Sequence, residues 1–262
     1  MAAPEPQSVR EFPDVVIDCR GRVSPLEADR LRDAIGGLLQ LRHITAGARV
    51  RVTEGNCDRG PMVVQVNLRV GDTPARVQVV VPSRHDVLPA ISRLDRQIGR
   101  VSAPWRPRPW PDQSRRVLAG VGDGVITRRK VCPLLRGTPL QAIVEMDAMD
   151  YNVHLFTDVE TGEDAVVYRA GPSGLRLARQ HRMCPPGSSL TASSQRAPLI
   201  VNPHPTPILT EAAAVDRVRD HGAPFLFFTD AATGRGCLLY RRYDGDLGLI
   251  TPDGSGPQNG AS

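Results

Sequence analysis

The chain has 262 residues, with Lys+Arg 33 against Asp+Glu 28 and a formal net charge of +5. This length exceeds one average domain and suits two or three small ones, each burying its own modest core. The five cysteines are scattered and no apolar run approaches a membrane span, so neither a disulfide framework, a zinc site nor a membrane helix is supported. We therefore expect a soluble, cytoplasmic protein without a cofactor or a metal.

Positive charge is concentrated in the first half of the chain. Residues 14–101 carry 14 Arg against 10 acids, residues 102–130 carry 7 basic against 2 acidic residues, and residues 131–262 carry 11 against 14. This asymmetry favours a polyanionic partner for the front of the molecule, and a solvated surface is the competing explanation. Nearly all the cations are arginine, whose planar donor fork suits phosphate oxygens, although codon bias in a GC-rich genome would give the same composition.

Proline-rich and glycine-rich stretches divide the chain into three blocks, because such stretches do not support regular elements. The predicted organisation is an N-terminal domain at 13–101, a linker at 102–124, one C-terminal domain at 125–182, a linker at 183–196, a second C-terminal domain at 197–254, and a tail at 255–262.

The first block has a β-α-β-β-β-α pattern. Strands are predicted from the period-two alternation, and the first helix from Ser24 as N-cap with Pro25 at the first helical position. The predicted strands are 15–20, 50–53, 62–70 and 75–81, and the second helix covers about 86–101. These elements indicate an α+β sandwich, with two helices packed on a four-stranded sheet.

The second helix separates an apolar side from an arginine side. Val87, Ile91, Leu94 and Ile98 recur at helical spacing and form the predicted core stripe. A ridge of arginines lies away from that stripe, at Arg93, Arg96 and Arg100. Like charges at this spacing weaken a helix slightly, which hints at a bound anion, and a solvated ridge is the alternative.

The second and third blocks are copies of each other at a constant offset of 72 residues. Asp158 and Gly162, for example, recur as Asp230 and Gly234, in a D-x-x-T-G turn that needs no catalytic role. Each copy is a predicted helix followed by three short strands, too small to stand alone. We therefore expect the two copies to pack on each other within a monomer. The predicted inter-repeat contacts are Leu155, Phe156, Tyr168, Phe227, Phe228 and Tyr240.

Four segments resemble the long form of the ribosome hibernation-promoting factor, historically called sigma-54 modulation protein. The third block carries the C-terminal signature as FFTDAATGRGCLLYRRYDGDLGLI at 227–250, and the second block a degraded version as LFTDVETGEDAVVYR at 155–169. Residues 125–131 resemble the strand that begins this domain, and AISRLDRQIGR at 90–100 resembles the N-terminal domain. The usual long form has one C-terminal domain, so two copies make this chain similar to the tandem-domain variant that mycobacteria use in dormancy or hypoxia.

The resemblance implies a non-catalytic protein that binds the small ribosomal subunit and its ribosomal RNA in the decoding channel, inhibits translation and stabilises idle ribosomes. The tandem copies favour single ribosomes over ribosome dimers. By position in the matching helix, Arg93, Arg96 and Arg100 would contact the RNA backbone. The further candidates for RNA contact are Arg20, Arg22, Arg51, Arg69, Arg76 and Arg84.

Two questions stay open at the level of sequence. The paired C-terminal copies could instead form a small-molecule sensor that regulates RNA or protein binding; a deep pocket between them would favour the sensor, and a packed aromatic interface would favour hibernation. Trp105 and Trp110 in the first linker could stack on RNA bases or anchor the linker to a domain.

Overall fold

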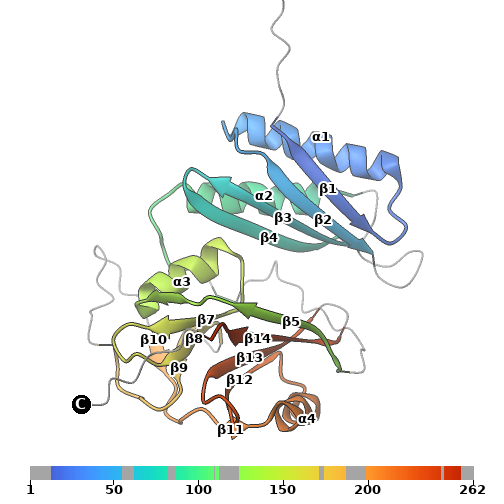
Figure 1. Ribbon diagram of the computed structural model, residues 1–262. Helices are drawn as coiled ribbons and strands as arrows, with labels where there is room; N and C mark the ends of the chain where they lie inside the picture. Colours follow the sequence, from blue (N-terminus) through green and yellow to red (C-terminus); the bar gives the residue numbers. More distant parts are fainter. Residues whose placement is uncertain are drawn as a thin grey trace, which may run out of the picture. The chain divides into compact units, whose positions relative to one another are not determined.

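The computed structural model describes residues 13–54, 62–81, 86–108, 110–111, 124–170, 174–186, 199–242 and 245–254 (Figure 1). The chain forms two compact units. The first unit is Met1–Trp105 together with Ala148–Asp150, and the second is Arg106–Asp147 together with Tyr151–Ser262. The described residues hold four helices and three sheets of four or five strands, which confirms the predicted α+β class. None of the described helices is long and apolar enough to cross a membrane.

The first unit contains one sheet in the order β1-β2-β3-β4. Its elements are β1 (Val15–Arg20), α1 (Pro25–Leu41), β2 (Ala48–Glu54), β3 (Met62–Val70), β4 (Thr73–Val81) and α2 (Leu88–Val101). β1 and β2 are parallel because α1 carries the chain back between them, and the remaining pairs are antiparallel. The predicted β-α-β-β-β-α order is confirmed, with α2 starting two residues later than expected.

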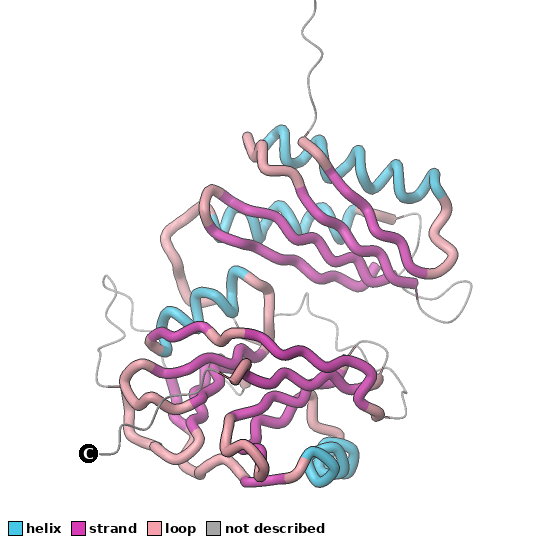
Figure 2. The backbone as a smooth tube through the Cα atoms, viewed as in Figure 1, coloured by secondary structure: helices cyan, strands magenta, loops and turns pink. Residues whose placement is uncertain are grey.

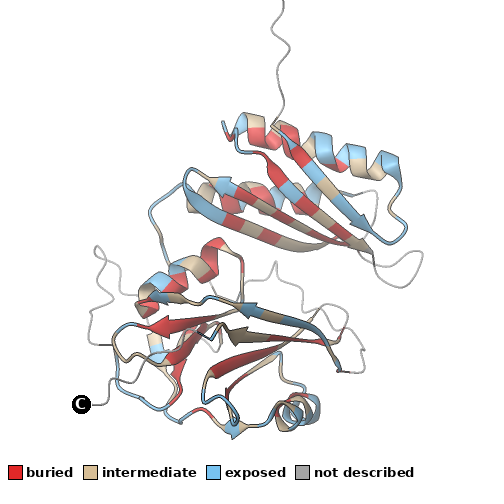
Figure 3. Cartoon of the chain, in the orientation of Figure 1, coloured by how far each residue is buried: buried red, intermediate tan, exposed pale blue. Residues whose placement is uncertain are grey.

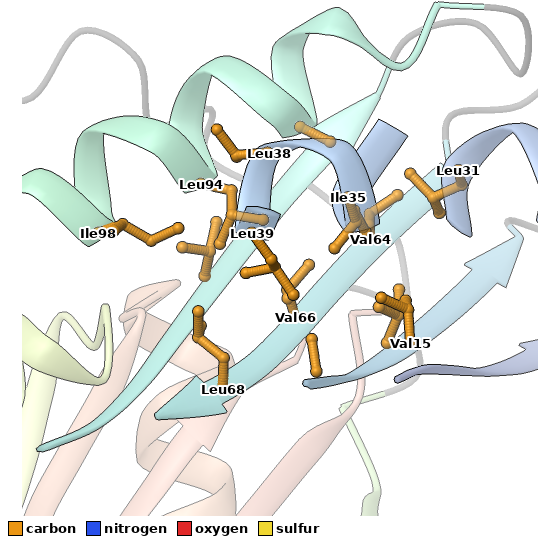
Figure 4. Close-up of a cluster of buried hydrophobic side chains, with 14 of the residues drawn as sticks. Val15, Leu31, Ile35, Leu38, Leu39, Val64, Val66, Leu68, Leu94 and Ile98 are labelled. Carbon is orange, nitrogen blue, oxygen red and sulfur yellow. The ribbon is translucent and has the colours of Figure 1, made fainter. Parts of the chain in front are cut away.

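Local signals in the sequence explain where α1 begins and which side it buries. Ser24 accepts a hydrogen bond from the Glu27 backbone N–H, and the Glu27 carboxylate accepts one from the Ser24 N–H at 2.9 Å, which completes a capping box. Figure 4 shows Leu39 of α1 near Leu94 of α2, and Ile35 of α1 near Val64 of β3, in the same cluster. All four side chains are buried, so the two helices share one core over the same face of the sheet.

The sheet of the first unit has one buried and one polar face, as the alternation predicts. Six of the seven residues assigned to the helix side are buried, whereas Val79 is only half-buried. The buried six are Val50, Val52, Val64, Val66, Leu68 and Val77. The opposite face carries the polar side chains and is the one that concerns a ligand.

The second unit contains the two repeats, each folded as predicted to within one or two residues at the element ends. Repeat 1 has β6 (Leu135–Gly137), α3 (Pro139–Ala148), β7 (Val153–Asp158), β8 (Asp164–Tyr168) and β9 (Leu175–Arg179). Repeat 2 has β11 (Ile208–Leu209), α4 (Glu211–His221), β12 (Phe225–Asp230), β13 (Gly236–Arg241) and β14 (Leu247–Pro252). In both repeats the three long strands form an antiparallel meander, visible in Figure 2.

The repeats exchange strands. β5 (Ile126–Cys132), which precedes repeat 1 in the chain, pairs with β14 of repeat 2. β10 (Leu199–Val201), which precedes repeat 2, pairs with β9 of repeat 1. The two pairings have the same register: Leu177 pairs with Val201, and Leu249 pairs with Arg129. Leu249 is 72 residues after Leu177, and Val201 is 72 residues after Arg129. The repeats are therefore related by an internal pseudo-twofold axis, and each sheet is completed by the other copy's strand.

The sheets of the two repeats also pack face to face. One buried cluster joins Leu155, Val166 and Ala178 of repeat 1 to Phe227 and Leu238 of repeat 2. The opposite face of the repeat 2 sheet packs on α4, through a separate cluster. Because both faces of these strands are covered, β7, β8, β12 and β13 are largely buried along their length (Figure 3).

Candidate nucleic-acid interface

The exposed side of α2 carries two of the three arginines predicted to form its ridge. Leu94 and Ile98 are buried on the core side, as the helical spacing predicts. Arg96 and Arg100 are exposed on the other side. The Nε of Arg96 donates to the carbonyl oxygen of Ser92, one turn earlier in the helix, at 3.2 Å.

The third ridge residue, Arg93, is buried instead, with 7% of its surface exposed. Its Nη2 lies 2.9 Å from Oδ1 and 3.2 Å from Oδ2 of Asp150, and its Nε also donates to Oδ2, at 3.3 Å. Asp150 belongs to the short segment Ala148–Asp150, which clusters with the first unit. Gln97 of α2 donates to the carbonyl oxygen of Ala148 at 2.7 Å, so the segment is held along the helix. No periodicity marks a partner 57 residues away, and the sequence therefore did not reveal it.

The polar face of the sheet is organised as a hydrogen-bonded surface. The strand register puts Arg51, Gln65 and Gln78 in one row, and Asn67 and Arg76 in the next. Arg76 donates to Gln65 Oε1 at 3.2 Å and also to Gln78, and Gln65 donates to Asn67 at 3.3 Å. Arg76 also donates to the carbonyl oxygen of Met149 at 3.3 Å, and these half-buried side chains form one hydrogen-bonded network across β3 and β4.

The remaining arginines of this face have weak, exposed partners. Asp18 lies 3.2 Å from Arg51 and 3.8 Å from Arg20, and these side chains are 38% and 64% exposed. Arg69 donates to the carbonyl oxygen of Asp72 at 2.6 Å. Exposed ion pairs contribute about 0–1 kcal/mol, so a phosphate can replace such partners at little cost. Arg22 is also exposed, and Arg84 lies outside the described residues.

The first linker is attached to repeat 1 at Trp110. The guanidinium of Arg169 lies over the Trp110 ring at 5.8 Å, and the ring packs against Gly174. Arg108 and Arg169 both contact the buried carboxylate of Asp147. This geometry corresponds to the anchoring alternative for Trp110 rather than to base stacking. Trp105 falls in the first unit and is half-buried.

The six residues predicted at the inter-repeat contact fall into three groups. Leu155, Phe227 and Tyr168 belong to the cluster between the sheets, where the Tyr168 and Phe225 rings meet edge to face at 5.2 Å. Phe228 lies in the core of repeat 2 under α4, and Phe156 takes the corresponding side of β7 because successive residues of a strand point to opposite faces. Tyr240 lies over Gly248 of the neighbouring strand, 6.0 Å from the Lys130 ammonium.

The aspartates of the repeated turns of the second unit have structural partners. Asp158 and Asp230 begin the predicted turns, and their backbone carbonyl oxygens accept from the N–H groups of Gly162 and Gly234. The Asp230 carboxylate also accepts from the Thr233 backbone N–H. Asp158 is in addition paired with Arg179 at 2.7 Å, both side chains being fully buried. Among the described residues, no three His, Cys, Asp or Glu side chains could hold a metal ion together.

Comparison with known proteins agrees with the motifs in the sequence. Residues 122–177 match the family described as Sigma 54 modulation/S30EA ribosomal protein C terminus. Over 262 residues the chain is 62% identical to the dormancy associated translation inhibitor of two strains of Mycobacterium tuberculosis, covering 99% of this chain and 96% of each relative. This is not an enzyme family, and the resemblance stated from the motifs is confirmed. The chain therefore belongs to the Sigma 54 modulation/S30EA family, in the group of the mycobacterial dormancy associated translation inhibitor.

Proposed function

We propose that the chain inhibits translation by binding the small ribosomal subunit through its first unit, in the channel that messenger and transfer RNA use. The observation that carries the proposal is the polar sheet face, which combines arginine and amide side chains in one hydrogen-bonded network. None of the predicted RNA contacts on this face is an aromatic side chain on which a base could stack. The face would therefore recognise the phosphates and the shape of the RNA rather than its base sequence. Family membership supports a ribosomal partner.

The arginines on α2 extend this basic surface in the proposal. Arg96 and Arg100 are exposed and contact RNA phosphates directly. Arg93 is engaged with Asp150 in a buried pair, so its part is to hold the helix unless that pair opens. The sheet-face contacts are Arg51, Arg69 and Arg76, with Arg20, Arg22 and Arg84 around them.

The pairing of the two repeats supports action on single ribosomes. In this proposal the surface that would recruit a second copy is occupied within the chain, by strand exchange and by the cluster between the sheets. The chain is then a monomer in solution and on the ribosome. The alternative of a small-molecule sensor has less support, because the faces between the repeats are filled by packed aromatic and aliphatic side chains.

Sedimentation with ribosomes at varied salt tests the RNA contact. The variant is Arg96→Ala/Arg100→Ala, and the matched control is Arg30→Ala/Arg32→Ala, which removes two exposed arginines from α1. Loss of two phosphate contacts lowers the salt dependence of binding, d log K/d log[salt], by about one to two units and weakens binding at every salt concentration. Equal effects of the two variants, or binding that does not respond to salt, would remove the assigned contact.

A further inference from the structure

The two repeats differ where they meet on the internal axis. Asp164, at the start of β8, and Gly236, at the start of β13, occupy equivalent positions 72 residues apart and contact each other directly. A Cβ atom on Gly236 would lie 2.6 Å from the Cβ of Asp164, closer than side chains approach. The axis therefore accommodates one side chain at this pair of positions and not two.

The single aspartate on the axis is bound entirely by repeat 2 and by its own strand neighbour. Its carboxylate accepts from Arg235 Nε at 2.8 Å, from Arg235 Nη2 at 3.2 Å and from the Gly236 backbone N–H at 2.9 Å. Thr157 of β7 donates to it at 3.1 Å. The Asp164 side chain is 2% exposed, so these donors replace the water that the carboxylate has lost.

A second contact beside the axis is also one-sided. Gln180 accepts from the Asp164 backbone N–H at 3.2 Å and donates to both Thr229 Oγ1 and the Gly234 carbonyl oxygen of repeat 2 at 3.0 Å. The position equivalent to Gln180 is Pro252, which offers neither group. Repeat 1 thus supplies a carboxylate and an amide, and repeat 2 supplies a guanidinium, a hydroxyl and free space.

Pairing of identical repeats would bring the wrong groups together. The residues equivalent to Arg235 and Gly236 are Glu163 and Asp164, so two copies of repeat 1 would bury two aspartates against each other with glutamates nearby. Two copies of repeat 2 would place glycine opposite glycine and leave both Arg235 guanidiniums without their carboxylate. Unpaired or like charges in such a buried position are strongly unfavourable.

We propose that Asp164, whose carboxylate is bound by Arg235 and Gly236, makes repeat 1 pair with repeat 2. The same residue prevents repeat 1 from pairing with another copy of repeat 1. The partner of each repeat is then the other kind of repeat, which the same chain supplies at high local concentration. This inference concerns what the C-terminal half binds and is independent of how the first unit contacts RNA.

The 72-residue offset allows these residues to be exchanged between the repeats in the full chain. Glu163→Arg/Asp164→Gly gives both repeats the Arg-Gly sequence, and Arg235→Glu/Gly236→Asp gives both the Glu-Asp sequence. The quadruple variant carries the two changes together and keeps the composition and net charge of the original chain. Thr229 stands where Thr157 does in repeat 1, so it can donate to an aspartate at 236.

Urea unfolding and light scattering are measured for the original chain, both double variants, their equimolar mixture and the quadruple variant. Each double variant should lose about 1–2 M in urea midpoint, and the quadruple variant should recover most of that loss. Mixing the double variants should produce a 1:1 heterodimer, because each Arg-Gly repeat then finds a Glu-Asp repeat. Double variants as stable as the original chain, a quadruple variant no better than the doubles, or a mixture without heterodimer would overturn the proposal. Ribosome binding of the quadruple variant reports separately on the first unit.

Discussion

At the scale of single residues, His154 makes the stability of the second unit depend on pH. The imidazole is largely buried in repeat 1, stacked near Tyr151, and its Nε2 has no hydrogen-bond partner in the described part of the chain. Burial lowers the pKa of His154 from 6.5 to about 4, even with the Glu145 carboxylate 3.7 Å away. Between these values the unfolded chain binds a proton that the folded chain does not, so stability falls as pH drops from 6.5 towards 4.

His154→Leu should abolish that loss, because the equivalent position in repeat 2 is Leu226. The depressed pKa corresponds to about 3 kcal/mol of stability that the original chain has at pH 7 and loses at pH 4. Urea unfolding at pH 7.5 and pH 4.5 measures the difference for both proteins. If both lose the same stability between the two pH values, His154 is not the responsible group.

The buried pair of Asp158 and Arg179 provides a second prediction at this scale. Asp158→Asn leaves Arg179 fully buried, with the Cys184 carbonyl oxygen at 2.6 Å and Glu160 as the nearest remaining carboxylate at 3.6 Å, and should destabilise the second unit by about 3–5 kcal/mol. The control is Asp230→Asn, because Asp230 begins the same turn in repeat 2 but is partly exposed, and Thr251 stands in place of the arginine. The control should lose about 1 kcal/mol or less by urea unfolding. Equal losses would mean that the turn, and not the ion pair, requires the aspartate.

At the scale of elements, strand exchange predicts that damage to one segment weakens the other repeat. Ile200 lies in the middle of β10, which the chain order assigns to repeat 2 but which pairs with β9 of repeat 1. Ile200→Pro disrupts this edge strand because proline cannot donate to a ladder. Hydrogen exchange should then speed up in β9 while β13 stays protected, and Ile200→Val should change neither. Faster exchange in β13 alone would contradict the observed pairing.

Most elements could be predicted from sequence because their signals are local. The Ser24 cap, the helical spacing of Leu94 and Ile98, and the alternation of β3 each depend on residues close in the chain. The exchange of β5 and β10 could not be predicted, because it depends on pairing between segments that are not joined by a short turn: Arg129 pairs with Leu249, and Val201 pairs with Leu177 across the second linker. Uninterrupted apolar runs such as FLFF in β12 do indicate strands that are buried on both faces.

The site was predictable in outline for the same reason. Helical periodicity correctly separates Arg96 and Arg100 from the core of α2, but it says nothing of Asp150, which buries Arg93 from a distant part of the chain. Likewise the duplication predicts that the repeats pair, whereas the pleat decides that Leu155 and not Phe156 faces the other repeat. The choice of face depends on what covers each side of the strand, which one repeat alone does not reveal.

At the scale of the whole molecule, each chain should bind one ribosome without joining it to a second. The pairing surfaces of the repeats are used within the chain, so adding it to ribosomes should leave them sedimenting as single particles at all protein concentrations. Sucrose gradients with the chain and with the quadruple axis variant measure this directly. A concentration-dependent peak of paired ribosomes with the original chain would contradict the proposed mode of action.

The most direct measurement is competition with messenger RNA on isolated small ribosomal subunits. A labelled messenger RNA is bound first, and the chain is then titrated with a filter-binding readout. Retained messenger RNA should fall to background near one chain per subunit. Arg96→Ala/Arg100→Ala should shift the titration to higher concentration, and Arg30→Ala/Arg32→Ala should not. Messenger RNA that stays bound alongside a stoichiometric amount of the chain would show that the chain does not occupy the messenger RNA channel.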